Sequence, residues 1–165
     1  MPTSNSEEIG KNLIAYCGLY CKDCIRYRSA FIDTAKELIN LLAECKFDRY
    51  ASIKSKHVTS FQEFDHFLNI LRDIVKLGCD TPCREGDGCQ TFDCEILRCC
   101  RDKGYEGCWQ CEEINTCEKF GFLEDFHGDY PKRNCRLIGQ YEIEEFIELR
   151  YPAYAWCENK HKTET

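Results

Sequence analysis

The stretch that decides the fold of this chain runs from Cys79 to Cys117 and reads CDTPCREGDGCQTFDCEILRCCRDKGYEGCWQCEEINTC. Cysteines recur along it at short intervals, while large aliphatic residues are few. A segment of this composition buries too little apolar surface to order itself, so bonds stronger than packing must hold it. Either its thiolates bind metal ions or its thiols form disulfides.

The rest of the chain favours metal. Its first ten residues are polar and acidic, without the basic start and apolar middle of a secretion signal. No apolar run approaches the ~18 residues of a membrane span, and the mean hydropathy is −0.52. We therefore expect a cytoplasmic protein with no membrane partner. Disulfides do not persist in a reducing cytoplasm outside thermophiles, and 15 cysteines, an odd number, cannot all pair within the chain.

The overall charge argues against one class of partner. The formal net charge is −7 and the sequence pI is near 5.2. An acidic surface repels phosphate backbones, so nucleic-acid binding is not expected in spite of the finger-like cysteine spacing. A protein partner of unknown kind stays open.

Zinc fits the cysteine spacing well. It takes four ligands in a tetrahedron, and a short C-x2-4-C pair supplies two of them from one turn. Several such pairs occur, and with the cysteines between them they give eleven predicted zinc ligands: Cys17, Cys21, Cys24, Cys79, Cys83, Cys89, Cys94, Cys99, Cys108, Cys111 and Cys117. Eleven is one short of three tetrahedral sets, so His57, His127, a carboxylate or a water would complete one. An open position in that set is where a zinc enzyme would act.

An iron–sulfur cluster is the alternative cofactor. Cys17, Cys21 and Cys24 have the C-x3-C-x2-C spacing that radical S-adenosylmethionine enzymes use. Those enzymes also need most of a parallel α/β barrel, and the chain has no alternating strand and helix pattern. The ferredoxin run of closely spaced cysteines is absent too. A cluster in a different scaffold therefore remains the second hypothesis, with an iron–sulfur redox protein as its function.

Apolar periodicity predicts an otherwise helical chain. Ser60 and Glu63 form a capping-box pattern at the start of one helix, and Gly78 and Gly104 each follow a helix as stop signals. The helices are predicted over residues 25–45, 61–77, 92–103 and 141–150.

The segments between these helices are predicted to be irregular. Residues 46–59 read as an irregular connection and residues 127–135 as a loop. Cys45 is interpreted as a small core residue rather than a ligand, because isolated cysteines are usually buried. Cys100 is interpreted as a packing residue because it sits next to Cys99 on another face of the predicted helix.

One pair of predicted ligands depends on where a helix begins. Cys94 and Cys99 are five residues apart, so on one continuous helix they would point about 140° away from each other. They can share a metal only if Cys94 lies in the capping turn before the helix.

These expectations combine into a mainly α fold: a small, irregular, metal-stabilised domain whose helices pack against a cysteine-rich zinc-binding segment. A flexible lead is predicted over residues 1–12, a single domain over 13–151 and a tail over 152–165. Within the domain, residues 79–117 are the cysteine-rich segment.

Several short motifs resemble one known family. They are Ala15-Tyr16-Cys17-Gly18-Leu19 with Cys21 and Cys24, then Cys94-Glu95-Ile96 with Cys99, then Lys103-Gly104 with Cys108 and Cys111, and Cys117-Glu118-Lys119. Over residues 13 to 151 the chain resembles the cysteine-rich bacterial and archaeal proteins of domain of unknown function 3795. The resemblance implies a mostly helical, cytoplasmic, metal-binding protein with no established activity. Ile25 and Thr116 stand where the family usually has proline, so the two turns there are expected to differ. Cys100 and Cys135 fall where the family pattern is apolar, so the resemblance implies that both are core residues rather than ligands.

The sequence therefore predicts a zinc-binding protein with structural cysteine-ligated sites, acting as a binding or interaction module. No phosphate loop, dinucleotide fingerprint or serine nucleophile motif is present. An iron–sulfur redox protein and a zinc-dependent enzyme with one open site are the alternatives.

Overall fold

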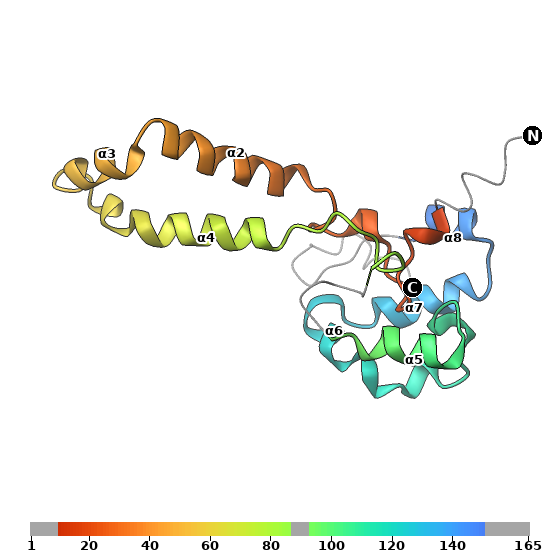
Figure 1. The fold of residues 1–165 in the computed structure, drawn as a ribbon. Helices are drawn as coiled ribbons and strands as arrows, with labels where there is room; N and C mark the ends of the chain where they lie inside the picture. Colours follow the sequence, from red (N-terminus) through yellow and green to blue (C-terminus); the bar gives the residue numbers. More distant parts are fainter. Residues whose placement is uncertain (1–9, 87–92, 151–165) are drawn as a thin grey trace, which may run out of the picture. The chain divides into compact units, whose positions relative to one another are not determined.

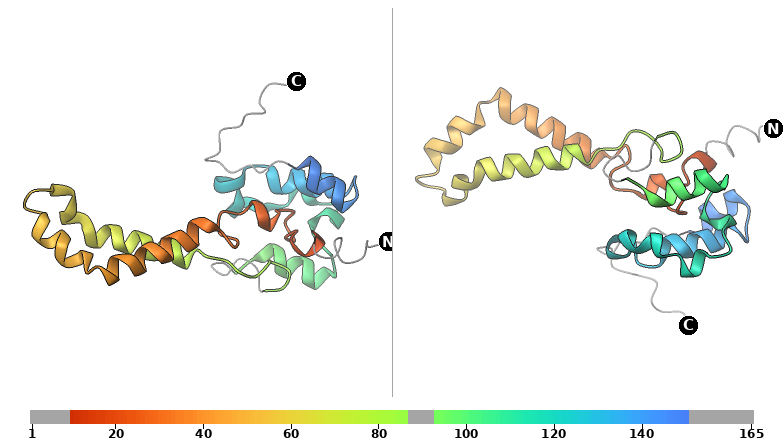
Figure 2. Two further views of the ribbon diagram at one scale, coloured as in Figure 1. Left: turned by 90° about the horizontal axis from the view of Figure 1, so that it is seen from above. Right: turned by 60° about the horizontal axis from the view of Figure 1, so that its bottom comes forward.

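The computed structural model describes residues 10–86 and 93–150. The chain divides into two compact units (Figures 1 and 2). Residues 25–80 form one, here called the hairpin unit, and residues up to Cys24 together with those from Thr81 form the other, the cysteine-rich unit. Helices dominate both, and the described residues contain isolated β-bridges but no strand. The predicted mainly α fold class is confirmed.

Two antiparallel helices build the hairpin unit, α2 (Ala30–Glu44) and α4 (Phe64–Lys76), and they pack along each other (Figure 1). The predicted first helix, over 25–45, starts later than expected because the preceding backbone is extended. There the N–H of Cys79 donates to the carbonyl of Arg26 at 2.8 Å, and the N–H of Arg28 donates to the carbonyl of Cys79 at 2.9 Å. This pairing closes the base of the hairpin.

The far end of the hairpin differs from the prediction. Residues 46–59 are not irregular throughout. The helix α3 (Phe47–Lys54) lies within this stretch, and the 3-10 helix η2 (Thr59–Glu63) begins at its last residue. Lys46 adopts a left-handed conformation, with φ of 54°, that separates α2 from α3. The Phe47 ring then packs 5.7 Å from that of Phe61 and 5.3 Å from that of Phe64. This aromatic packing stabilises a short helix that periodicity does not reveal.

Two smaller predictions about the hairpin unit are wrong. Neither η2 nor α4 has a side-chain hydrogen bond at its N-cap, so the expected capping box of Ser60 and Glu63 does not form. Cys45 is exposed rather than buried in the core, and its thiol donates to the carbonyl of Leu42 at 3.5 Å. The stop at Gly78 agrees with a helix that ends at Lys76.

In the cysteine-rich unit, short helices surround a small core. The predicted helix over 92–103 is present as α5 (Glu95–Lys103), which ends at Gly104 with φ of 67°. Cys94 is its N-cap, the position that allows Cys94 and Cys99 to share a metal. The other elements are η1 (Cys21–Asp23), η3 (Cys108–Gln110), η4 (Ile114–Thr116), η5 (Glu118–Phe120), α6 (Gly121–His127), α7 (Tyr130–Ile138) and α8 (Ile143–Leu149).

The prediction of a loop over residues 127–135 is wrong, because α7 includes most of these residues. Pro131 lies in the first turn of α7, where a missing backbone N–H breaks no helical hydrogen bond. The helix carries Cys135 into the core, while α8 matches the helix predicted over 141–150.

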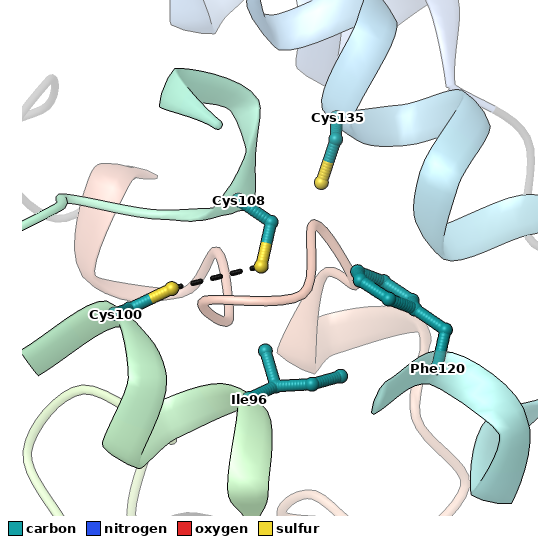
Figure 3. Close-up of a cluster of buried hydrophobic side chains, with 5 residues drawn as sticks. All are labelled: Ile96, Cys100, Cys108, Phe120 and Cys135. Carbon is teal, nitrogen blue, oxygen red and sulfur yellow. Dashed lines mark hydrogen bonds between the residues drawn. The ribbon is translucent and has the colours of Figure 1, made fainter. Parts of the chain in front are cut away.

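Ile96, Cys100, Cys108, Phe120 and Cys135 form the buried cluster of this unit (Figure 3). Cys100 is 2% exposed and Cys135 is 1% exposed, so their interpretation as core residues is confirmed. Among the described residues, no three His, Cys, Asp or Glu side chains are arranged to hold a metal ion. The structure therefore gives the predicted metal stabilisation no support of its own.

Parts of the predicted organisation lie outside the described residues. They include Cys89, the tail over 152–165, and the lead over 1–12 apart from its last three residues. Within residues 10–86 and 93–150, no helix combines the length and the apolar character needed to cross a membrane.

Candidate functional site

A small cavity in the cysteine-rich unit is lined by five cysteines. It has a volume of about 20 Å³, and its cysteines come from α5, from η3 and from the segments beside η3 and η4. Lys103 and Lys119 also line it, together with apolar side chains from the core. The five cysteines are Cys99, Cys100, Cys108, Cys111 and Cys117.

The local structure explains how these thiols gather. Cys99 and Cys100 are adjacent on α5, so one is buried in the core while the other is only partly covered. Cys108 begins η3 and Cys111 follows it, and the N–H of Cys111 donates to the carbonyl of Cys108 at 3.0 Å. This tight turn holds the C-x2-C pair together, as its spacing predicts. Cys117 lies between η4 and η5.

Two of the buried thiols make direct contact. The Sγ atoms of Cys100 and Cys108 are 3.6 Å apart, and the side chain of Cys135 lies on the other side of Cys108 (Figure 3). The pKa of Cys100 is lowered, first by its hydrogen bond with Cys108 and then by the charges of Arg84 and Lys103. The pKa of Cys108 is raised by the same hydrogen bond and by burial. Either sulfur atom can be the donor in this contact, and the pair shares one proton most favourably.

A basic side chain lies beside the more exposed thiols of the cavity. The pKa of Lys103 is raised, mainly by negative charge on Cys111 and Cys99. A raised lysine pKa means that the ammonium is favoured next to thiolates. Lys103 therefore places one positive charge beside Cys99 and Cys111.

The loop around Cys17 approaches the same core from the N-terminal side. An antiparallel bridge joins Ile14 to Tyr20, and Gly18 makes the turn between them with φ of 85°. The buried amide of Asn134 donates to the carbonyl of Gly18 at 3.0 Å. These contacts attach the loop to α7.

Cys17 lies among further thiols. Its pKa is raised well above the ordinary value, first by burial and then by negative charge on Cys83, Cys135 and Cys94. A backbone hydrogen bond from Leu19 opposes this rise. Three predicted ligands, Cys17, Cys83 and Cys94, are thus electrostatic neighbours.

Arg84 connects these segments and was not singled out by the sequence. Its guanidinium donates to the carbonyl of Ile14 at 2.7 Å and to that of Glu106 at 2.6 Å. It also lies 4.9 Å from the ring centre of Tyr16 and 5.2 Å from that of Trp109. An arginine within a cysteine-rich segment carries no sequence signal that would distinguish it from a surface residue.

The other predicted ligands that the structure describes do not line this cavity. Cys21 and Cys24 are partly buried at either end of η1. Cys79 belongs to the hairpin unit, whereas Cys83 belongs to the cysteine-rich unit. Of the two candidate histidines, His57 is exposed in the hairpin unit, and His127 lies at the end of α6 with its pKa lowered by burial.

No disulfide joins any of the cysteines that the structure describes. The donor atoms around the cavity are soft thiols, which suit zinc, and the cavity has the size of a single ion or water. As described above, however, these thiols do not form a ready ligand set.

Comparison with known proteins gives the chain a family. No curated protein and no solved structure matches it. A sequence model of one family matches residues 13–122, which is more than half of the chain and ends before α7. The matched region includes every predicted metal ligand, whereas Cys135 lies beyond it. The chain therefore belongs to the family described as protein of unknown function (DUF3795).

Proposed function

We propose that this protein binds zinc through Cys99, Cys108, Cys111 and Cys117, and that it acts as a binding or interaction module in a reducing compartment. The observation that carries the proposal is that these four predicted ligands line one cavity. Four thiolates make one complete tetrahedral set.

The size and the spacing within the cavity support a single ion. About 20 Å³ is enough for one particle the size of a water molecule. Zinc–sulfur bonds of about 2.3 Å in a tetrahedron separate the sulfur atoms by about 3.8 Å. Cys100 and Cys108 already lie at 3.6 Å, so the packing here tolerates sulfur atoms at that separation. The other side chains would have to turn toward the ion.

Metal binding must also displace protons. The pKa of Cys108 is raised by its hydrogen bond with Cys100 and by burial, so this thiol is protonated in the absence of metal. Zinc would replace that proton, which makes the apparent affinity fall as the pH falls. The positive charge of Lys103 would offset part of the negative charge of four thiolates.

A second site would draw on the thiols around Cys17. Cys83 and Cys94 both act electrostatically on Cys17, and zinc could take these three thiols as ligands. Cys21 and Cys24, which belong to the same unit, would complete this set or contribute to a third.

Metal analysis of protein purified without oxygen tests the proposal. We expect a colourless protein with at least one zinc per chain, and loss of circular dichroism signal after the zinc is removed by a chelator. A brown protein with sulfur-to-iron charge-transfer absorption would support the iron–sulfur alternative instead. A protein without metal that keeps its spectrum in chelator would rule out both.

A pair of variants assigns the site. Cys111→Ser with Cys117→Ser is expected to lose about one zinc per chain, because two of the four ligands are removed. Cys45→Ser is the matched control, because Cys45 is an exposed cysteine in the hairpin unit. Equal zinc content in the two proteins would contradict the assignment.

The basic side chain beside the thiols gives a further prediction. Lys103→Glu is expected to weaken zinc binding roughly tenfold, because it places a negative charge next to Cys111 and Cys99. Competition with a zinc chelator of known affinity measures this change. Lys56→Glu, at an exposed position of the hairpin unit, is the control and should leave the affinity unchanged.

A further inference from the structure

The hairpin unit exposes apolar side chains that a two-helix layer cannot cover by itself. On α2, the buried residues Ile32 and Ala35 mark the side that packs against α4. A second apolar stripe on α2 remains exposed. It consists of Phe31, Leu38 and Leu41, which are 50%, 36% and 52% exposed.

The same arrangement recurs on α4. Leu71 is its buried residue and marks the side toward α2. Phe67, Ile70 and Leu77, at the end of the helix, are 43%, 45% and 45% exposed. Each helix thus has one stripe for its neighbour in the hairpin and another that faces outward.

The two outward stripes lie on the same side of the hairpin. Successive residues of a helix are rotated by 100° about its axis. On both helices the centre of the exposed stripe is rotated by about 90–100° from the centre of the packed side. The direction of this rotation, viewed along the chain, is the same for α2 and α4. Antiparallel neighbours are related by a twofold rotation about an axis perpendicular to their layer. That rotation exchanges the two helices but does not exchange the two faces of the layer. Because the exposed stripe is rotated from the packed side by the same angle on both helices, both stripes lie on the same face.

The opposite side of the layer is polar. Lys36 pairs with Asp33 on α2 at 3.5 Å, and Lys76 pairs with Asp73 on α4 at 2.8 Å. Arg72 donates to Asn69 at 3.1 Å on the same helix. The charged residues of both helices therefore gather away from the apolar face.

We propose that the apolar face of the hairpin unit binds the same face of a second copy of this chain, which forms a four-helix bundle from two hairpins. The proposal does not depend on metal binding. The face is defined by six side chains: Phe31, Leu38, Leu41, Phe67, Ile70 and Leu77.

Charge and area favour a second copy as the occupant. The chain carries a net charge of −7, so two copies repel each other wherever acidic surfaces meet. The six side chains of this face are uncharged, which lets two copies meet here without that repulsion. A large apolar side chain has an area of about 200 Å², so six of them near half exposure bury about 500 Å² per copy. A pair then buries about 1,000 Å², the lower limit for a specific interface.

The dimensions of the two helices also favour a second copy as the occupant. Helices of 15 and 13 residues are about 20 Å long and pack 8–10 Å apart. Two such hairpins stack face to face into a bundle in which every apolar stripe has a neighbour. The bundle is the simplest assembly that covers both stripes at once.

Light scattering after size-exclusion chromatography, with and without chelator, tests this proposal. The full chain is expected to have twice its monomer mass of 19.4 kDa, whether metal is bound or removed. Leu41→Glu with Ile70→Glu is expected to raise the dimer dissociation constant at least about a hundredfold, because charge is placed in the apolar interface. Both positions are exposed in the single chain, so the helices should be retained.

Asn40→Glu with Asn69→Glu is the matched control, because it adds the same charge to the polar side of α2 and α4. This protein is expected to remain dimeric, and circular dichroism checks that both variants stay helical. A native chain that is monomeric at about 100 μM would overturn the proposal, because an interface of this area should hold there. A dimer that withstands the apolar-face changes would overturn it too.

Discussion

Replacing Gly18 by alanine is expected to destabilise the cysteine-rich unit by about 2–5 kcal/mol. A Cβ at this position would lie 2.8 Å from the Sγ of Cys135 and 2.9 Å from the carbonyl oxygen of Pro131. Both distances are too short for non-bonded atoms, so α7 would have to move away. The backbone at Gly18 is also left-handed, with φ of 85°, which adds about 1–2 kcal/mol for any residue with a side chain.

Gly104→Ala separates these two effects. Gly104 also has a left-handed backbone, with φ of 67°, but a Cβ there would meet no atom within 4 Å. It should therefore lose only the backbone part, about 1–2 kcal/mol. Urea unfolding followed by tryptophan fluorescence measures both changes, because Trp109 belongs to the cysteine-rich unit. Equal losses in the two variants would show that the close approach of Gly18 to α7 does not matter.

Local sequence patterns predicted the helices well where a helix has a stripe and a clear end. α5 ends at Gly104 as expected, and the long helices of the hairpin follow the apolar periodicity of the sequence. The same patterns missed α3 and α7, because an isolated Pro131 or a basic stretch reads as a loop. Tertiary contacts decide such short helices: the Phe47 ring packs against Phe61 and Phe64, and Cys135 enters the core.

The cysteines illustrate a second limit. Spacing predicted which of them could be ligands, but adjacent residues on a helix point in different directions, and only a fold shows which thiols meet. Cys99 and Cys111 lie around one cavity although η3 and the end of α5 separate them in sequence. Cys100, predicted only to fill the core, contacts the predicted ligand Cys108 at 3.6 Å. Such meetings depend on how α5 and η3 pack, which spacing does not encode.

The polar contacts of the core were equally beyond sequence reasoning. Arg84 joins the segments around Ile14 and Glu106, and Asn134 binds the backbone of Gly18. Each contact spans a long stretch of chain and involves residue types that are common on surfaces. Their role follows from burial and hydrogen-bond geometry alone.

The most distant of these contacts gives the second large prediction. Arg150 and Asp23 are 127 residues apart, and the guanidinium donates to both carboxylate oxygens at 2.8 Å. The two side chains are only 15% and 17% exposed, and the guanidinium lies 4.0 Å from the ring centre of Tyr20. Arg150 also donates to the carbonyl of Ile147. The pair attaches the turn between Cys21 and Cys24 to the end of α8.

Asp23→Ala is therefore expected to destabilise the protein by about 2–4 kcal/mol, because it leaves a largely buried guanidinium without its partner. Glu106→Ala is the control: its ion pair with Lys11 has side chains 52% and 38% exposed, and pairs of that kind contribute about 0–1 kcal/mol. Adding Arg150→Met to Asp23→Ala should restore part of the loss, since the second change removes the unpaired charge. Urea unfolding of the single and double variants measures this coupling. Strictly additive losses would mean that Asp23 and Arg150 stabilise the fold independently, and that the turn at Cys21 is held by other contacts.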